Sequence, residues 1–161
     1  MPLGQLLGPA LAWAAFCCFR LCLDGLSKDS AADGLKGVSF ARRALEVADD
    51  DPNVLANAAI ALAYFGEDIG AMTALADRAV ALNPSFARGW YTCGVLRCWG
   101  GEPDAAIQDV NAAIRFSPRA RVVYELVGAS ATGRFQPRRI AMNRSPKQRT
   151  APAIVTAVDR S

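Results

Sequence analysis

One stretch of the sequence has the spacing of a phosphate-binding loop. Gly128 and Gly133 stand five residues apart in GASATGR, like the glycines of loops that cradle nucleotide phosphates. Such loops continue with a lysine, which reaches the terminal phosphates, and with a serine or threonine hydroxyl, which binds magnesium. Arg134 follows here instead, and no strand-like segment precedes the glycines. We therefore do not expect nucleotide binding at this stretch.

Two pairs of carboxylates could in principle perform acid–base catalysis: Asp49 with Asp50, and Glu102 with Asp104. Both pairs fall at predicted helix starts, where negative charge offsets the positive end of the helix dipole, so capping is the simpler interpretation. The chain has no histidine, which removes the commonest general base and the usual activator of a serine or cysteine nucleophile. The sequence therefore predicts no catalytic residue and no enzyme.

The five cysteines do not have the spacing of a metal site. They form two groups, Cys17, Cys18 and Cys22 in one apolar stretch and Cys93 and Cys98 in another. With an odd number of cysteines and no histidine, a zinc site is not expected. Small buried thiols in a reducing cytoplasm are the better interpretation. The sequence thus predicts no metal, no cofactor and a cytoplasmic location.

The 161 residues, of which 52% are apolar, suffice for one domain with a packed core. Charge divides the chain at Gly133: residues 1–133 include 11 basic and 14 acidic side chains, and the remainder has 7 basic and 1 acidic. A basic end can attract nucleic acid or anionic lipid unspecifically, but most such tails are simply solvated. We expect an extension at 1–8, a helical domain at 9–133 and a basic, disordered tail at 134–161, with no specific nucleic-acid partner.

The apolar run at 6–19, LLGPALAWAAFCCF, has the character of a signal sequence or a membrane span. A signal sequence begins with basic residues, and no lysine or arginine precedes this run. A spanning helix needs about 20 apolar residues, whereas Arg20 and Asp24 interrupt the run too early. Because the length is that of a buried core helix, we expect a helix in the domain core and no membrane partner.

Small residues recur along the chain at a nearly fixed period. Ala44, Ala79 and Ala113 are separated by 35 and 34 positions. A period of this length is typical of stacked helical repeats, in which each unit has an apolar face too large to bury alone and packs against its neighbour. The sequence therefore predicts a stack of similar units.

Turn signals recur with the same period. Asn83-Pro84 and Ser117-Pro118 fall 34 residues apart, and Asp51-Pro52 ends an acidic run in the corresponding earlier place. Proline disfavours helix in the residue before it, and Asp, Asn and Ser accept hydrogen bonds from the free amides of the next helix. Gly66 and Gly100-Gly101 break each unit midway. Each unit is thus predicted to contain two helices of about 14 residues.

This pattern resembles the tetratricopeptide repeat, most clearly at 87–118 and less well at 53–84. The match is carried by residues that the family keeps large, small or turn-forming: Trp90, Gly94, Gly101, Ala106, Ala113 and Pro118. The resemblance implies an all-α fold, a right-handed α-α superhelix of about three helix hairpins plus part of a fourth. A degenerate first unit is expected at 10–51, and the fourth is expected to start at Arg121.

The chain is more narrowly similar, over about 10–131, to the repeat tails of bacterial regulators that carry adenylate-cyclase or winged-helix DNA-binding domains. Neither domain is present here, so neither chemistry is implied for any residue. The repeat pattern ends abruptly near Thr132. We therefore expect a fragment or a frame-shifted product.

In the family's register, the first helix of each pair lines the concave side of the superhelix. The positions that would contact a ligand there are Asn53, Ala56, Asn57, Ile60, Tyr64, Arg88, Tyr91, Thr92, Val95 and Trp99. Tyr, Trp and Arg are common interface anchors, but aromatic residues at helical spacing are usually core, so Tyr64 and Trp99 fit both interpretations. The lysine and asparagine pattern that clamps a peptide's terminal carboxylate is absent, which disfavours capture of chaperone tails.

The resemblance implies a scaffold that binds a peptide or helix of another protein in the concave groove. The alternative is a regulatory module detached from a cyclase or a winged-helix regulator. A third possibility, nucleic-acid binding, rests only on the basic tail. The unpaired final helix of such a stack also predicts self-association or poor solubility.

Overall fold

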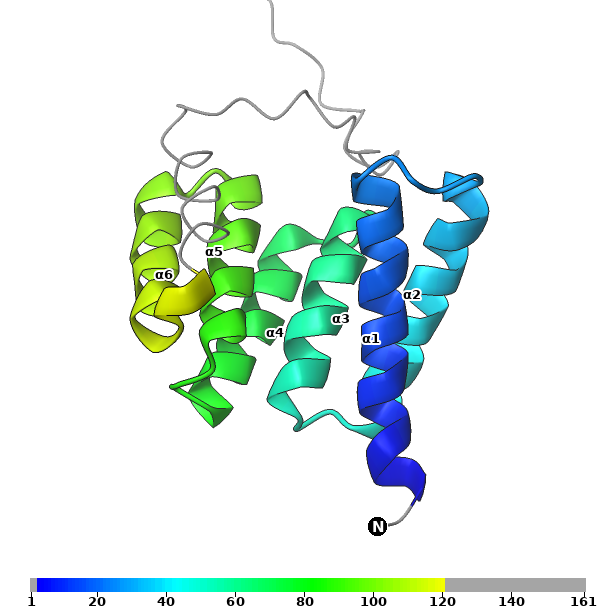
Figure 1. Ribbon diagram of the computed structural model, residues 1–161, viewed down its shortest axis with the longest axis horizontal. Helices are drawn as coiled ribbons and strands as arrows, with labels where there is room; N and C mark the ends of the chain where they lie inside the picture. The colour runs from blue at the N-terminus through cyan, green and yellow to red at the C-terminus, as the bar shows by residue number, and fades with distance from the viewer. Residues whose placement is uncertain (1–2, 121–161) are drawn as a thin grey trace, which may run out of the picture.

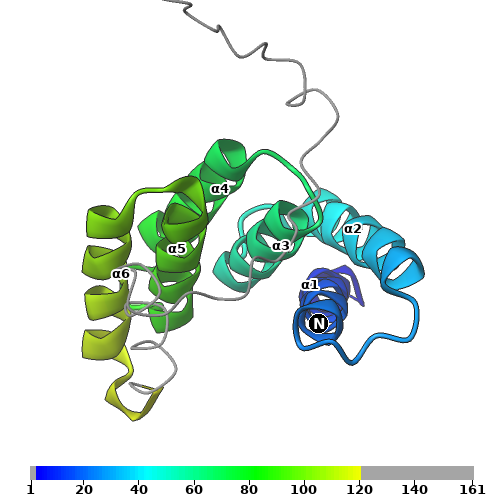
Figure 2. The same ribbon diagram turned by 90° about the horizontal axis from the view of Figure 1, so that it is seen from above.

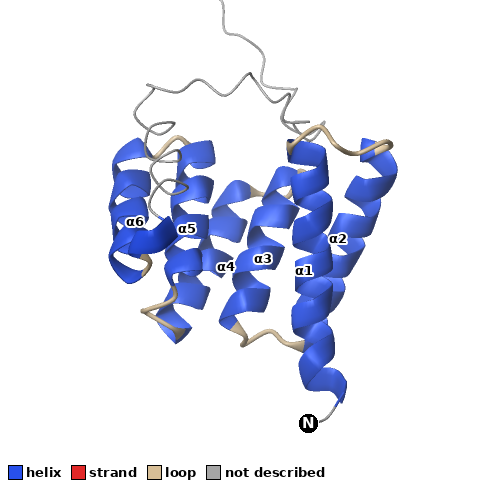
Figure 3. Ribbon diagram, in the orientation of Figure 1, coloured by secondary structure: helices blue, strands red, loops and turns tan. Residues whose placement is uncertain are grey.

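The computed structural model describes residues 3–120, which form six α-helices and a short 3-10 turn, η1 (Figure 1). The elements are α1 Leu3–Leu23, α2 Ser30–Val47, α3 Pro52–Tyr64, α4 Ile69–Leu82, α5 Ala87–Gly100, α6 Pro103–Phe116 and η1 Pro118–Ala120. Within these residues there is no strand (Figure 3), so the expected all-α class is confirmed for this part of the chain. The predicted fourth hairpin from Arg121, the stretch GASATGR and the basic tail lie outside the described residues.

Aspartate side chains fix the starts of three helices. Asp29 accepts a hydrogen bond from the Ala32 amide at 3.0 Å before α2, and Asp68 accepts one from the Ala71 amide at 2.8 Å before α4. Asp51 accepts from the Asn53 amide at 2.7 Å, and the residue after it is the proline that opens α3. Capping in this way satisfies amides that have no partner inside the helix. The predicted turn between α2 and α3 is therefore confirmed in its place and in its physical cause.

Glycine ends the first helix of two successive pairs. Gly66 has φ +107° after α3, and Gly101 has φ +84° after α5. These left-handed conformations are strained for residues with a side chain, so glycine is the residue that can turn the chain there. The midpoint breaks predicted from these glycines are confirmed, and α3 to α6 have 13 or 14 residues each.

The first hairpin differs from its predicted boundaries. α1 begins at Leu3, so the segment expected as an extension at 1–8 is helical from that residue on. The connection to α2 ends at Asp29, because the side chain of this aspartate caps the helix. α1 is also less buried than a core helix: one face packs against α2 and α3, and the other faces solvent.

The helices form two layers (Figure 2). α1 contacts α3, and α3 contacts α5, so the odd helices pack side by side in one layer. Each even helix packs against the odd helix before it, while α2, α4 and α6 make no close backbone contact with one another in the described chain. Since the odd layer is continuous and the even layer is spread apart, the stack curves toward the odd helices.

Small residues allow α5 and α6 to approach closely. A Cβ atom built on Gly94 would lie 2.9 Å from Val110 Cγ2 and 3.1 Å from the Ala106 carbonyl oxygen, so no larger residue fits without displacement. Ala106 and Ala113 are fully buried. In packing this dense, even one added methyl group lowers stability. The structural roles expected for Gly94 and Ala106 agree with this contact.

Trp90 joins two pairs of helices. Its ring is partly buried and packs against Val110 and Ala113 of α6 as well as against the core between α3, α4 and α5. Its indole Nε1 donates a hydrogen bond to the Pro84 carbonyl at 2.8 Å. A buried tryptophan generally needs such a partner for its polar end. The ring therefore ties the α4–α5 connection to the last hairpin.

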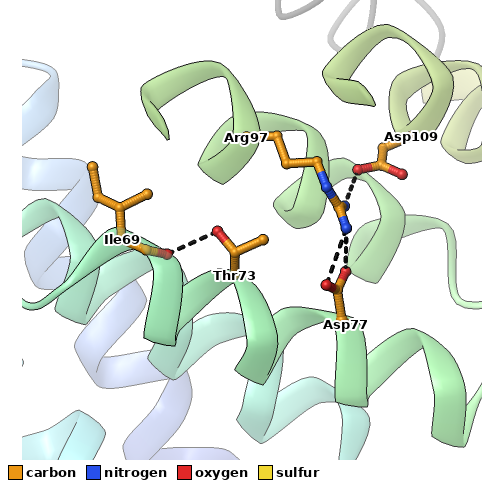
Figure 4. A network of polar contacts seen from close by, with 5 residues as sticks. All are labelled: Ile69, Thr73, Asp77, Arg97 and Asp109. Carbon is orange, nitrogen blue, oxygen red and sulfur yellow. Dashed lines mark hydrogen bonds and ion pairs between the residues drawn. The ribbon is translucent and has the colours of Figure 1, made fainter. Parts of the chain in front are cut away.

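Arg97 of α5 links α4 and α6, which have no close backbone contact with each other in the described chain (Figure 4). Its guanidinium donates to both oxygens of Asp77 in α4, at 2.8 and 3.0 Å, and to Asp109 in α6. Burial alone would lower the pKa of Arg97, but the carboxylates of Asp109 and Asp77 raise it above its ordinary value. The pKa of Asp109 is also raised, because burial outweighs its attraction to Arg97.

One described helix, α1, is long and apolar enough over Leu6–Leu23 to cross a membrane by length and composition. Only 28% of that window is buried in the fold. Length and composition alone do not separate a spanning helix from a signal sequence or from a helix of a soluble protein. The single charge Arg20 does not shorten the run enough to exclude a span, contrary to the expectation from the sequence.

Candidate functional site

The residues expected to line a groove form two stripes on neighbouring helices of the odd layer. On α3 the stripe is Asn53, Asn57, Ile60 and Tyr64, and on α5 it is Arg88, Tyr91, Thr92, Val95 and Trp99. Spacings of three and four residues place side chains on one face of a helix. Since α3 contacts α5, the two stripes adjoin. We call them, with the adjoining face of α1, the odd-helix face.

The structure leaves fewer of these residues open than a groove would require. Asn53 is exposed, and Tyr64, Arg88, Tyr91 and Trp99 are partly buried. The other positions are buried: Ala56, Asn57, Ile60, Thr92 and Val95. Ile60 and Val95 belong to the main hydrophobic cluster, together with residues of α1. The odd-helix face is therefore closed by its own side chains in this structure.

Aromatic rings from all three odd helices meet at one end of the face. Phe19 of α1 lies 5.1 Å from Tyr64 of α3 and 6.4 Å from Trp99 of α5 between ring centroids, both with edge-to-face geometry. Phe16 lies 5.5 Å from Phe19 in the same way. Such pairs contribute about 1 kcal/mol each beyond their buried area. Of the two interpretations of Tyr64 and Trp99, packing against neighbouring helices is thus the one observed, and burial raises the pKa of Tyr64.

Arg88 joins α5 to α1 at the other end of the face. Its guanidinium carbon lies 4.3 Å from the centroid of the Trp13 ring and 4.3 Å from that of the Phe16 ring. A cation over an aromatic face at this distance contributes roughly 0.5 to 2 kcal/mol. The sequence singled out Arg88 but not its two ring partners, because the first unit was too degenerate to assign their faces. We call these three residues the arginine clasp.

Asn57 is the unusual residue of this face. Its side chain is 1% exposed, and within the described chain neither its amide nitrogen nor its amide oxygen has a hydrogen-bond partner. A buried polar group without a partner costs about 1 to 3 kcal/mol. Asn53 lies one turn earlier on the same stripe and is exposed. The stripe therefore carries an unsatisfied donor and an unsatisfied acceptor beneath the closed face.

The thiols and carboxylates do not assemble into a reactive centre within residues 3–120. In this part of the chain no three His, Cys, Asp or Glu side chains are placed to hold a metal ion. Cys93 is buried, and burial raises its pKa far above that of an ordinary thiol, which leaves little thiolate to react. Cys17, expected to be buried, is exposed. Glu102 and Asp104 lie at the start of α6, but the Glu102 side chain makes no capping hydrogen bond to a helix amide, so the expected capping is not observed for Glu102.

No protein-family model matches the chain, and no curated protein sequence matches it.

Proposed function

We propose that the chain is a tetratricopeptide-type solenoid that binds a peptide or helix of another protein on the odd-helix face. Three features support the repeat assignment: helices that pair in chain order, a continuous inner layer of odd helices, and small residues at the α5–α6 crossing. In stacks of this kind the inner layer is the extended surface available to a partner. The proposal assigns no catalysis and no cofactor to the chain.

The observation that carries this proposal is the unsatisfied amide of Asn57. A side-chain amide offers one acceptor and two donor hydrogens, which match the carbonyl and the amide of a peptide backbone. A partner that supplied both groups would remove the cost of burying Asn57 unpaired, and this gain would exist only in the complex. Asn57 would then form hydrogen bonds with the partner's main chain. The surrounding residues would select the partner's side chains.

Binding requires the closed face to open. Contacts of the arginine clasp and of the Phe19, Tyr64 and Trp99 rings join α1 to α5 over α3, and Asn57 lies on α3. These contacts contribute a few kcal/mol in total, so separating α1 from α5 costs a modest amount of free energy. That cost is recovered if the partner's apolar groups contact the same rings. We therefore expect a partner segment with aromatic or large aliphatic side chains beside its backbone contact.

The test is selection of a displayed peptide library against the full chain, followed by titration of the selected peptides with variants. Asn57→Leu has similar volume and no amide, so we expect it to weaken binding at least tenfold, equivalent to about 1.4 kcal/mol. The matched control is Thr73→Val on α4, which removes the hydrogen bond from Thr73 Oγ1 to the Ile69 carbonyl at 2.8 Å, away from the odd-helix face. The control is expected to bind like the unaltered chain.

The stability of the same variants separates loss of a contact from loss of the fold. Because Asn57→Leu removes two unsatisfied buried groups, its free energy of unfolding without peptide should rise by about 1 to 3 kcal/mol in urea denaturation. Thr73→Val should show no such rise. A selection that enriches no peptide, or an Asn57→Leu variant that binds as tightly as the control, would refute the proposal.

A further inference from the structure

Trp13 and Phe16 of α1 form the two walls of a corner that holds a cation. Their spacing along the helix places both side chains on one side of it. The ring centroids lie 5.7 Å apart, and the ring planes meet at 83°. The guanidinium carbon of Arg88 lies over both rings, 4.3 Å from each centroid. Both rings therefore turn an aromatic face, which carries partial negative charge, toward the same point. We call the two rings the cation corner.

The cation in the corner comes from a helix that has no close backbone contact with α1. In the described chain α1 and α5 each pack against α3, and they approach one another only through side chains. Trp13 is 44% exposed, and Phe16 and Arg88 are partly buried. Rotation of the Arg88 side chain can therefore empty the cation corner without movement of either helix, and a group from outside the chain can then reach it.

We propose that the cation corner is a binding site for a guanidinium group of the partner, and that Arg88 occupies this site until an arginine of the partner replaces it. The inference rests on the proposed function, because the cation corner and Asn57 belong to the same odd-helix face. The structure itself indicates the occupant, since a guanidinium already lies between the two rings. Exchange of one guanidinium for another keeps both cation–π contacts, so displacement of Arg88 costs little free energy.

Shape, hydration and charge favour an arginine over other side chains of the partner. A guanidinium is planar, so it can stack on one aromatic face while its N–H groups point at the second. It is also more weakly hydrated than the ammonium group of lysine, so it leaves water at a smaller cost. A neutral side chain would leave the cation–π contacts of Arg88 unreplaced. The 14 acidic and 11 basic side chains of residues 1–133 give this part of the chain a negative charge, which attracts a cationic peptide.

The site itself is tested by emptying it in the full chain. Arg88→Ala removes the internal cation, ethylguanidinium chloride is the probe, and the neutral isostere ethylurea is its control. The indole N–H signal of Trp13 in nuclear magnetic resonance, assigned by its loss in Trp13→Leu, should shift saturably with ethylguanidinium and not with ethylurea. The unaltered chain should show a much smaller shift, since Arg88 occupies the cation corner. Equal responses of Arg88→Ala to the two probes, with its helix content unchanged by circular dichroism, would overturn the proposal.

Peptides selected from the displayed library test the partner's arginine. An arginine should recur at a fixed position of the peptides whose binding depends on Asn57. Its replacement by citrulline, the neutral isostere, should weaken binding to the unaltered chain about fivefold. The arginine and citrulline peptides should bind equally to Trp13→Leu. Arg88→Ala should bind the arginine peptide more tightly than the unaltered chain does, because no internal cation has to leave. Arg43→Ala, which removes an exposed arginine of α2, is the matched control for charge and should bind like the unaltered chain.

The outcomes separate this inference from the proposed function. Peptides that bind through Asn57 but tolerate citrulline would overturn the guanidinium site and leave the proposed function standing. A loss with citrulline that persists in Trp13→Leu would do the same, as would peptides enriched in Asp or Glu, because Arg88 itself would then contact the partner. A library that yields no peptide would refute the proposed function and, with it, the partner's arginine, even if ethylguanidinium shifts the Trp13 signal.

Discussion

At the residue scale, Gly94 shows how a missing side chain stabilises the stack. Helix α5 also contains Gly100, where a Cβ atom would lie 3.5 Å from its nearest neighbour, Ile69 Cγ2. That distance is ordinary van der Waals contact, whereas the distances at Gly94 are too short. The two glycines therefore differ in what a methyl group would meet, although both are helical.

Gly94→Ala should lower the free energy of unfolding by about 1 to 3 kcal/mol, because the added methyl group forces α6 away from α5. Gly100→Ala should be neutral or stabilising by about 0.5 to 1 kcal/mol, since alanine has the higher helix propensity and the site has room. Urea denaturation followed by circular dichroism measures both. Equal effects of the two substitutions would contradict close packing at Gly94.

Residue roles could be predicted from the sequence where they follow from spacing, and not where they follow from tertiary contacts. The resemblance to the tetratricopeptide repeat pointed to Gly94 and Ala106 as the small residues of a helix crossing. The same register placed Asn57 on one stripe with Asn53, Ile60 and Tyr64. It could not show that Asn57 is buried without a partner, nor that Arg88 stacks on Trp13, since both depend on how far α1 closes over α3.

At the element scale, helix boundaries were predictable where a proline, an aspartate cap or a positive-φ glycine marks them. The α2–α3 turn and the breaks at Gly66 and Gly101 carry such signals, and the structure confirms them. At the start of α1, Pro2 stands before Leu3 without an aspartate cap beside it, and this start was not predicted. The link that Arg97 makes between α4 and α6 was also not predicted, because no regular sequence spacing connects Arg97 with Asp77 and Asp109.

The Arg97 network predicts a pH dependence of stability. Since burial raises the pKa of Asp109 in the folded state, its contribution to stability is fully present below the ordinary pKa of an aspartate, 3.8, and is lost as pH rises through the raised value. Asp109→Asn cannot take up this proton. The stability of the unaltered chain relative to Asp109→Asn should therefore increase as pH is lowered from 7 toward 4. Urea denaturation at several pH values measures it, and a relative stability that falls on acidification would show that the pKa is lowered instead.

At the scale of the whole molecule, the described residues form a curved stack whose inner layer is closed by its own aromatic side chains. The class of fold could be predicted from the 34-residue period, because paired helices of that length can bury their apolar faces only by stacking. The closure could not, since it results from α1 and α5 meeting across α3. A face of this kind can bind a partner only by exchanging internal contacts for contacts with the partner.

The most direct test of this account is a titration of the isotopically labelled full chain with a selected peptide, followed by amide signals in nuclear magnetic resonance. If the peptide binds on the odd-helix face, the largest changes occur along the stripes of α3 and α5 and include the side-chain amide of Asn57. The outer faces of α2, α4 and α6 should change little. Changes confined to those outer faces, with the Asn57 side-chain signal unmoved at saturation, would contradict binding on the odd-helix face.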